Sequence, residues 1–189
     1  KGRWRFFWGR WGTAGEVALE EGDIINIPTG IFRGFENIGS DYGMIMAILG
    51  GDDAGGGVTW APQVIEDAAE HGLILGENGR LYDSKNGEVL PDGLKPMPIL
   101  SSDVLTRIPE PTAKEFVPLY VARYRDLMSL AANQTVQVIG EGGVLKDKPG
   151  FSVDFITRNS GSSAQEKFDD SVVFMPMRGH WRLSWGDEK

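Results

Sequence analysis

The chain of 189 residues contains no cysteine and only two histidines, His71 and His180. Without cysteine it can form no disulfide framework, no thiolate metal site and no cysteine nucleophile. The chain has fewer basic than acidic residues, 19 lysines and arginines and 27 aspartates and glutamates, so its net charge is −8. An excess of negative charge argues against nucleic acid or an anionic membrane as a partner.

Long apolar runs are also missing. No run approaches the roughly 20 residues that a membrane-spanning helix needs. The basic and aromatic opening does not have the pattern of a signal peptide. We therefore expect a cytoplasmic protein with no membrane partner, and a hydrophobic content of 41% is enough for a substantial core.

A phrase near the start of the chain returns near its end. "KGRWRFFWG" at residues 1–9 aligns with "RGHWRLSWG" at residues 178–186, with identical residues at five of nine positions. In both copies large apolar residues alternate with other residues, which is typical of a β-strand. The copies lie 177 residues apart, so we expect equivalent strands of two tandem repeats, in a chain cut from a longer protein.

Short apolar segments separated by Gly, Pro, Asn and Asp predict β-strands over residues 1–50 and 134–186. Between them, the pattern predicts a helix over 61–72 and tight turns at Asn78-Gly79 and Asn86-Gly87. Apolar residues recurring at helical spacing from Phe116 to Ala131 predict a second helix that packs against the sheet. The fold class is therefore mainly β with a few helices.

One segment carries a more specific pattern, "GDIINIPTGIFRGFEN". Its fixed positions are Gly22, Pro28, Gly30, Arg33 and Asn37. This spacing resembles the second sequence motif of the cupin superfamily, G-x5-P-x-G-x2-H-x3-N, with arginine at the histidine position. The resemblance implies a cupin-like double-stranded β-helix, a jelly-roll barrel, with Arg33 presented to the barrel interior.

The repeat and the motif together imply a fragment of a two-barrel cupin. Residues 1–50 would be the second half of one barrel, 51–133 a linker with short helices and a small meander, and 134–189 the first half of the next barrel. Half a barrel has exposed edges that favour pairing with the complementary half. That half could come from the same chain or from a second copy, and we expect a homodimer.

The resemblance does not extend to a metal site. The first cupin motif would place its glutamate at Val172 and its two histidines at Gln165 and Lys167, or at Glu166 and Phe168. None of these residues is histidine. His71 is expected to end a helix and His180 to lie on the surface. We therefore predict no bound metal, no other cofactor and no catalytic residue in this chain.

The function that follows is a metal-free cupin-type domain that binds a small acidic molecule at Arg33, whose guanidinium can form two hydrogen bonds to a carboxylate. The predicted apolar lining consists of Trp4, Phe6, Trp8, Trp181 and Trp185. Three alternatives remain open. Arg33 could form an internal ion pair with Glu166, the chain could be part of a ring-cleaving dioxygenase of the gentisate or quercetin type, or the domain could be structural and bind no ligand.

Overall fold

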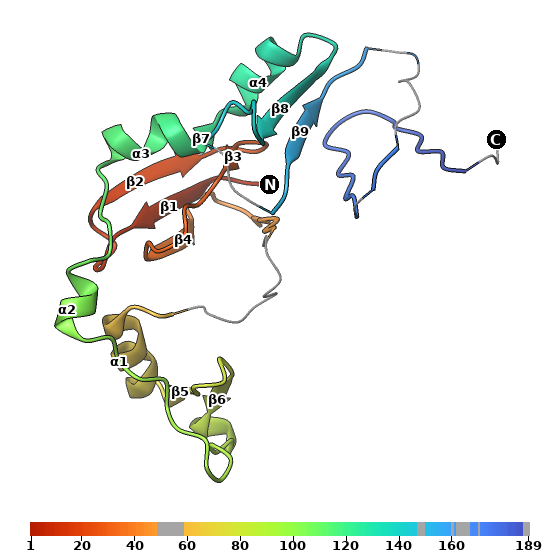
Figure 1. Ribbon diagram of the computed structural model, residues 1–189. Helices are drawn as coiled ribbons and strands as arrows, with labels where there is room; N and C mark the ends of the chain where they lie inside the picture. Colours follow the sequence, from red (N-terminus) through yellow and green to blue (C-terminus); the bar gives the residue numbers. More distant parts are fainter. Residues whose placement is uncertain (49–58, 147–149, 160, 162–166, 170, 187–189) are drawn as a thin grey trace. The chain divides into compact units, whose positions relative to one another are not determined.

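A computed structural model describes residues 1–48, 59–146, 150–159, 161, 167–169 and 171–186. The chain divides into two units, Lys1–Thr157 and Arg158–Lys189. All the helices and strands among the described residues belong to the first unit (Figure 1). No described helix is long and apolar enough to cross a membrane.

The N-terminal sheet consists of β1 (Trp4–Trp8), β2 (Gly15–Leu19) and β4 (Arg33–Asn37), in the order β2-β1-β4 and with antiparallel pairing. Alternate residues of a strand point to the same face of its sheet. Trp4, Phe6 and Trp8 therefore define one side of the sheet, which we call the aromatic face. The predicted alternation of the opening phrase is confirmed.

The opposite side, the charged face, is held by ion pairs. Arg5 donates to Glu36 at 2.9 Å and to Glu16 at 2.8 Å, so it links both outer strands to the central strand. These two carboxylates, Glu36 first, raise the pKa of Arg5 above its ordinary value. Because all three side chains are exposed, the pairs contribute more to register than to stability.

Helix α3 (Ala113–Tyr120) covers the aromatic face, as Figure 1 shows. Its buried Phe116 stacks on Trp8 with a centroid distance of 4.3 Å and lies 5.8 Å from the Phe6 ring. The buried indole of Trp8 donates to the Pro111 carbonyl oxygen at 2.6 Å. Gly15 leaves room for this ring, because a Cβ there would overlap it. The predicted packing of a helix against the sheet is confirmed.

The same end of the sheet is fastened by Glu110. Its carboxylate accepts the Arg10 backbone N–H at 2.6 Å and the Arg10 guanidinium at 3.1 and 3.3 Å. The backbone hydrogen bond first, and the guanidinium second, hold the pKa of Glu110 below its ordinary value. This contact joins the β1–β2 turn to the segment that leads into α3.

We expect Glu110→Gln to lower the free energy of unfolding by about 1 kcal/mol at pH 7, because a charge-assisted contact at a partly exposed site is lost. The folded-state pKa is depressed, so the stabilisation is present above the ordinary carboxyl value of about 4.3 and is lost as the pH falls through the lowered one. Urea unfolding at pH 7 and in acid measures both effects. Glu66→Gln, an exposed change on helix α1 (Pro62–Glu70), is the control. A gap between wild type and Glu110→Gln that persists unchanged in acid would contradict the prediction.

The single helix predicted from Phe116 to Ala131 is wrong. The chain instead forms α3, a short strand β7 (Val121–Ala122) and helix α4 (Tyr124–Ala131). Strand β7 pairs with β3 (Ile24–Ile25), and the Tyr120 carbonyl accepts the Asn26 N–H at 2.8 Å instead of a helical donor. Pairing with a distant strand therefore overrides the local helical pattern.

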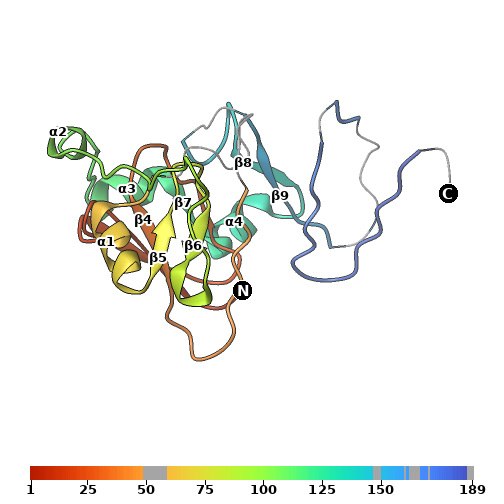
Figure 2. The same ribbon diagram turned by 90° about the horizontal axis from the view of Figure 1, so that it is seen from below.

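A second core forms around α4. Strands β8 (Thr135–Ile139) and β9 (Val153–Ile156) pair as an antiparallel hairpin with a register shift, and α4 packs beside them (Figure 2). The buried members of this core are Ala122, Leu127, Val138, Ile139 and Leu145. Asn26 ties it to the first strands, because its buried amide donates to the Lys146 carbonyl at 2.7 Å.

The middle of the chain follows the predicted turns. Helix α1 (Pro62–Glu70) starts at a proline and ends next to His71, and β5 (Leu73–Leu75) pairs with β6 (Leu81–Asp83) across the Asn78-Gly79 turn. A 3-10 turn, η1 (Ser84–Asn86), then ends at a left-handed Gly87, and a short helix α2 (Ser102–Leu105) follows.

The second unit differs from the prediction. The described residues between 158 and 186 contain no helix or strand, so the expected strands at "SVVFMPM" and at the closing tryptophan phrase are absent. The cause is the lack of partners. In β1 the phrase lies between β2 and β4 under α3, whereas residues 181–185 pair with no strand among the described residues. A strand pattern alone does not form a strand.

The described residues thus form small antiparallel sheets with few helices, and the mainly β prediction is confirmed at that level. Strands from residues 1–50 pair with one another and with β7, while β8 pairs with β9. Within the described part of the chain these sheets do not close into a barrel. The boundaries 1–50, 51–133 and 134–189 remain a prediction.

Candidate functional site

The glycine and proline positions of the motif shape the approach to β4. Gly22 and Gly30 have φ values of +87° and +84°, in the left-handed region that glycine tolerates and other residues avoid. Gly22 turns the chain between β2 and β3, and Gly30 turns it again before β4. The motif spacing therefore places Arg33 at the first residue of β4 and Asn37 at its last.

Arg33 lies opposite Trp8 in the β1–β4 register, so its Cβ is on the aromatic face. Its side chain is exposed, which corrects the expectation that it points into a barrel interior. The reason is that β4 is an edge strand, and no closed sheet among the described residues passes over it. No carboxylate in the described part of the chain pairs with Arg33, and Glu166 lies outside that part.

The predicted apolar lining is separated by the structure into two groups. Phe6 and Trp8 are fully buried and Trp4 is half-buried, so these side chains form a packed core and not the wall of a cavity. Trp181 and Trp185, by contrast, are 44% and 83% exposed. The aromatic residues that sequence reasoning assigned to a ligand belong to the core in β1 and to an uncovered segment in the second unit.

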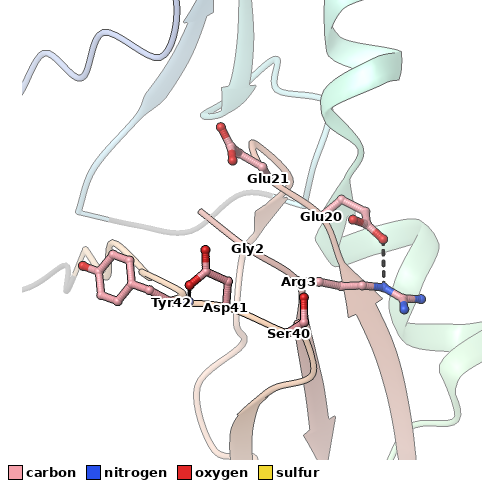
Figure 3. A pocket seen from close by; sticks show the side chains of 8 residues that line it. Gly2, Arg3, Glu20, Glu21, Ser40, Asp41 and Tyr42 are labelled. Atoms are coloured by element: carbon pink, nitrogen blue, oxygen red, sulfur yellow. Dashed lines mark hydrogen bonds and ion pairs between the residues drawn. The ribbon is translucent and has the colours of Figure 1, made fainter.

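The first unit has two open hollows on either side of the turn after β2. The one in Figure 3, of about 330 Å³, is lined by Gly2, Arg3, Glu20, Glu21, Gly39, Ser40, Asp41 and Tyr42. Arg3 reaches Glu20 at 3.0 Å, while the carboxylates of Glu21 and Asp41 stand apart from it. This lining is acidic and suits a small anion poorly.

The second hollow, of about 410 Å³, borders a half-buried ion pair that sequence reasoning missed. The Asp23 side chain is 4% exposed and the Arg123 side chain 32%. Asp23 accepts the Arg123 guanidinium at 2.7 Å, the Tyr124 N–H at 2.9 Å and the Glu20 N–H at 2.9 Å. Arg123 also donates to the Ala18 carbonyl at 2.6 Å, on the outer edge of β2. The only local signal was the aspartate after Gly22, because its partner is 100 residues away.

The two histidines occupy the predicted kinds of position. His71 follows the last residue of α1, where its ring nitrogen Nδ1 lies 2.8 Å from the Asp67 carbonyl oxygen, and His180 is exposed. Among the residues that the structure describes, no three His, Asp or Glu side chains gather closely enough to hold a metal ion. The absence of a bound metal stays a prediction.

The chain has no match among family models, curated proteins or solved structures. The candidate site therefore depends on the geometry of β4 and on the resemblance of its motif.

Proposed function

We propose that this chain is part of a metal-free cupin-type protein that binds a small acidic molecule through Arg33. The observation that carries the proposal is an exposed guanidinium with no carboxylate partner among the described residues, at the motif position where cupins have a histidine. In a chain with a net charge of −8, an arginine that begins a strand and has no carboxylate partner among the described residues is well suited to an organic anion.

The neighbours of Arg33 on β4 suit such a ligand. Arg33, Phe35 and Asn37 alternate onto the aromatic face, which provides a cation, an exposed aromatic ring and an amide in one row. The carboxylates of Glu16 and Glu36 are on the charged face, where Arg5 holds them. The row on β4 therefore combines positive charge with an apolar surface and contains no carboxylate.

The acidic hollows on either side of the β2 turn support the same assignment by contrast. Glu20 and Glu21 line both hollows and Asp41 lines the first, and these carboxylates repel an anion, while Arg3 is paired with Glu20. Arg123 is likewise occupied by Asp23 and the Ala18 carbonyl, and Arg125 pairs with Asp126. An acidic ligand would thus be directed to Arg33 and not to either hollow.

Titration calorimetry with benzoate and succinate as probes tests this proposal. We expect Arg33→Gln to weaken binding about tenfold or more, because a charged hydrogen-bond donor is lost. Arg33→Lys should retain the charge but lose the two-pronged geometry, and so give an intermediate loss.

Arg107→Gln makes the same charge change at an exposed position outside β4 and is the matched control. Equal weakening by Arg33→Gln and Arg107→Gln would mean that only net charge matters, and would overturn the assignment of Arg33. If the wild-type chain bound neither benzoate nor succinate, the proposed function would be overturned.

A further inference from the structure

The outer edge of β4 is open to another strand. The bonds Gly9 N–H to Phe32 carbonyl and Ile38 N–H to Arg3 carbonyl show which backbone groups of this segment face β1. Because hydrogen-bonded and non-bonded pairs alternate along antiparallel strands, the backbone groups of Arg33, Phe35 and Asn37 face away from β1. No backbone partner meets this edge within the described part of the chain.

The other edge of the sheet is less available. The Arg123 guanidinium occupies the Ala18 carbonyl on β2, so part of that edge already has a hydrogen-bond donor. Strand β4 also has an exposed Phe35 ring beside its free edge. A free edge with an exposed aromatic residue is a template for pairing with another strand.

The second unit contains a segment with the matching pattern. Residues 181–185, which we call the tail strand, repeat β1 as "WRLSW" against "WRFFW". Their large side chains Trp181, Leu183 and Trp185 are all exposed, and the described residues around them form no strand. In β1, the same pattern already shows how it pairs with β4.

That existing pairing supplies the charge complementarity. Arg5 in β1 lies opposite Glu36 and donates to it at 2.9 Å on the charged face, while Phe6 lies opposite Phe35 on the aromatic face. The equivalents of Arg5 and Phe6 in the tail strand are Arg182 and Leu183. An antiparallel strand in the same register would place Arg182 beside Glu36 and Leu183 beside Phe35.

We propose that the tail strand of one chain adds to the outer edge of β4 in a second copy of the chain, and that the exchange is reciprocal. Each copy then gives one strand and receives one, so the contact closes as a two-fold dimer and leaves no free β4 edge. Backbone hydrogen bonds along β4 hold the strand, and Leu183 packs against the exposed Phe35 with a tryptophan on either side of it. The assembly does not require the acidic ligand.

Size-exclusion chromatography with light scattering gives the first test. The wild-type chain is expected at twice its 20.7 kDa mass, and Trp181→Asp with Trp185→Asp is expected to return it to 20.7 kDa. Trp11→Asp, which changes a 59% exposed tryptophan outside β4 and the tail strand, should leave the dimer intact. A wild-type chain that stays monomeric at micromolar concentration, or a dimer insensitive to the tail change, would overturn the proposal.

A mixing experiment distinguishes exchange between copies from pairing within one chain. Arg182→Glu and Glu36→Arg should each be monomeric alone, because like charges would meet at both contacts. In an equimolar mixture, one contact of the heterodimer joins the two substituted side chains as an ion pair of reversed polarity, and the other contact keeps the native Arg182 and Glu36. The doubled mass should therefore return. Mixing cannot rescue pairing within one chain, and failure to recover the dimer would contradict the exchange.

Glu36 also pairs with Arg5 inside the sheet, so changing it could disturb the fold as well as the dimer. A second pair of variants therefore tests the β4 edge without changing charge. Phe35→Pro removes the outward N–H of β4, whereas Phe35→Ala keeps it and loses the same ring. We expect Phe35→Pro to raise the dissociation constant of the dimer at least tenfold more than Phe35→Ala does. Circular dichroism should confirm that both variants fold. Equal dissociation would show that the ring, and not the backbone edge, makes the contact.

Discussion

Replacement of Trp8 by alanine is expected to lower the free energy of unfolding by about 3–5 kcal/mol, the range for removal of a large buried aromatic side chain. Trp8 is fully buried, stacks on Phe116 and donates its indole N–H to the Pro111 carbonyl. Its removal leaves a cavity between the sheet and α3 and an acceptor without its donor. Urea unfolding followed by far-ultraviolet circular dichroism measures the loss.

Two variants show which part of Trp8 matters. Trp8→Phe keeps an aromatic ring against Phe116 but loses the hydrogen bond, so we expect a smaller loss of stability. Trp11→Ala removes a 59% exposed tryptophan from the adjoining turn and should change stability by no more than about 0.5 kcal/mol. Similar losses for Trp8→Ala and Trp11→Ala would contradict the assignment of Trp8 to the core.

Replacement of Asp23 by alanine is expected to lower the free energy of unfolding by about 2 kcal/mol, because it removes a buried acceptor from a half-buried ion pair. Three donors then lose Asp23 as an acceptor, namely the Arg123 guanidinium, which still donates to the Ala18 carbonyl, and the backbone N–H groups of Tyr124 and Glu20. The change releases α4 and the turn after β2 together. Chemical unfolding of the variant beside the wild type measures it.

Asp23→Asn retains an oxygen acceptor without the charge, so its free energy of unfolding should lie between those of Asp23→Ala and the wild type. Asp169→Ala is the matched control, since the ion pair of Asp169 with Lys167 is 85% and 88% exposed and contributes little. If Asp23→Ala unfolded at the same urea concentration as Asp169→Ala, the Asp23 contacts would not stabilise the fold.

Local sequence patterns predicted the elements that follow the ordinary periodicity of a strand or a helix. The alternation of Trp4, Phe6 and Trp8 was sufficient to predict β1 and its buried face, because one residue in two points to the same side. The helical spacing around Phe116 likewise predicted the cover of that face. The break at Val121 and Ala122 was not predictable locally, since it depends on pairing with Ile24 and Ile25.

The candidate site was predictable only in part. The motif spacing located the two left-handed glycines and a strand that contains Arg33, although this strand begins at Arg33 itself. It did not reveal that β4 is an edge strand, because strand order depends on contacts between distant residues. The repeated phrase predicted a second strand from its pattern, but strand formation also requires a partner with a free edge.

The cover of the aromatic face is separated from the sheet by a long stretch of chain, and this has a consequence for synthesis. Trp8 meets Pro111 across 103 residues, and Arg123 reaches Asp23 across 100. On the ribosome, the three strands emerge first and hold Phe6 and Trp8 uncovered until α3 has left the exit tunnel. Contacts so distant in sequence close slowly, and exposed apolar strands are prone to association in that interval. A chaperone that shields apolar strands would therefore act on the nascent chain between the synthesis of β4 and that of α3.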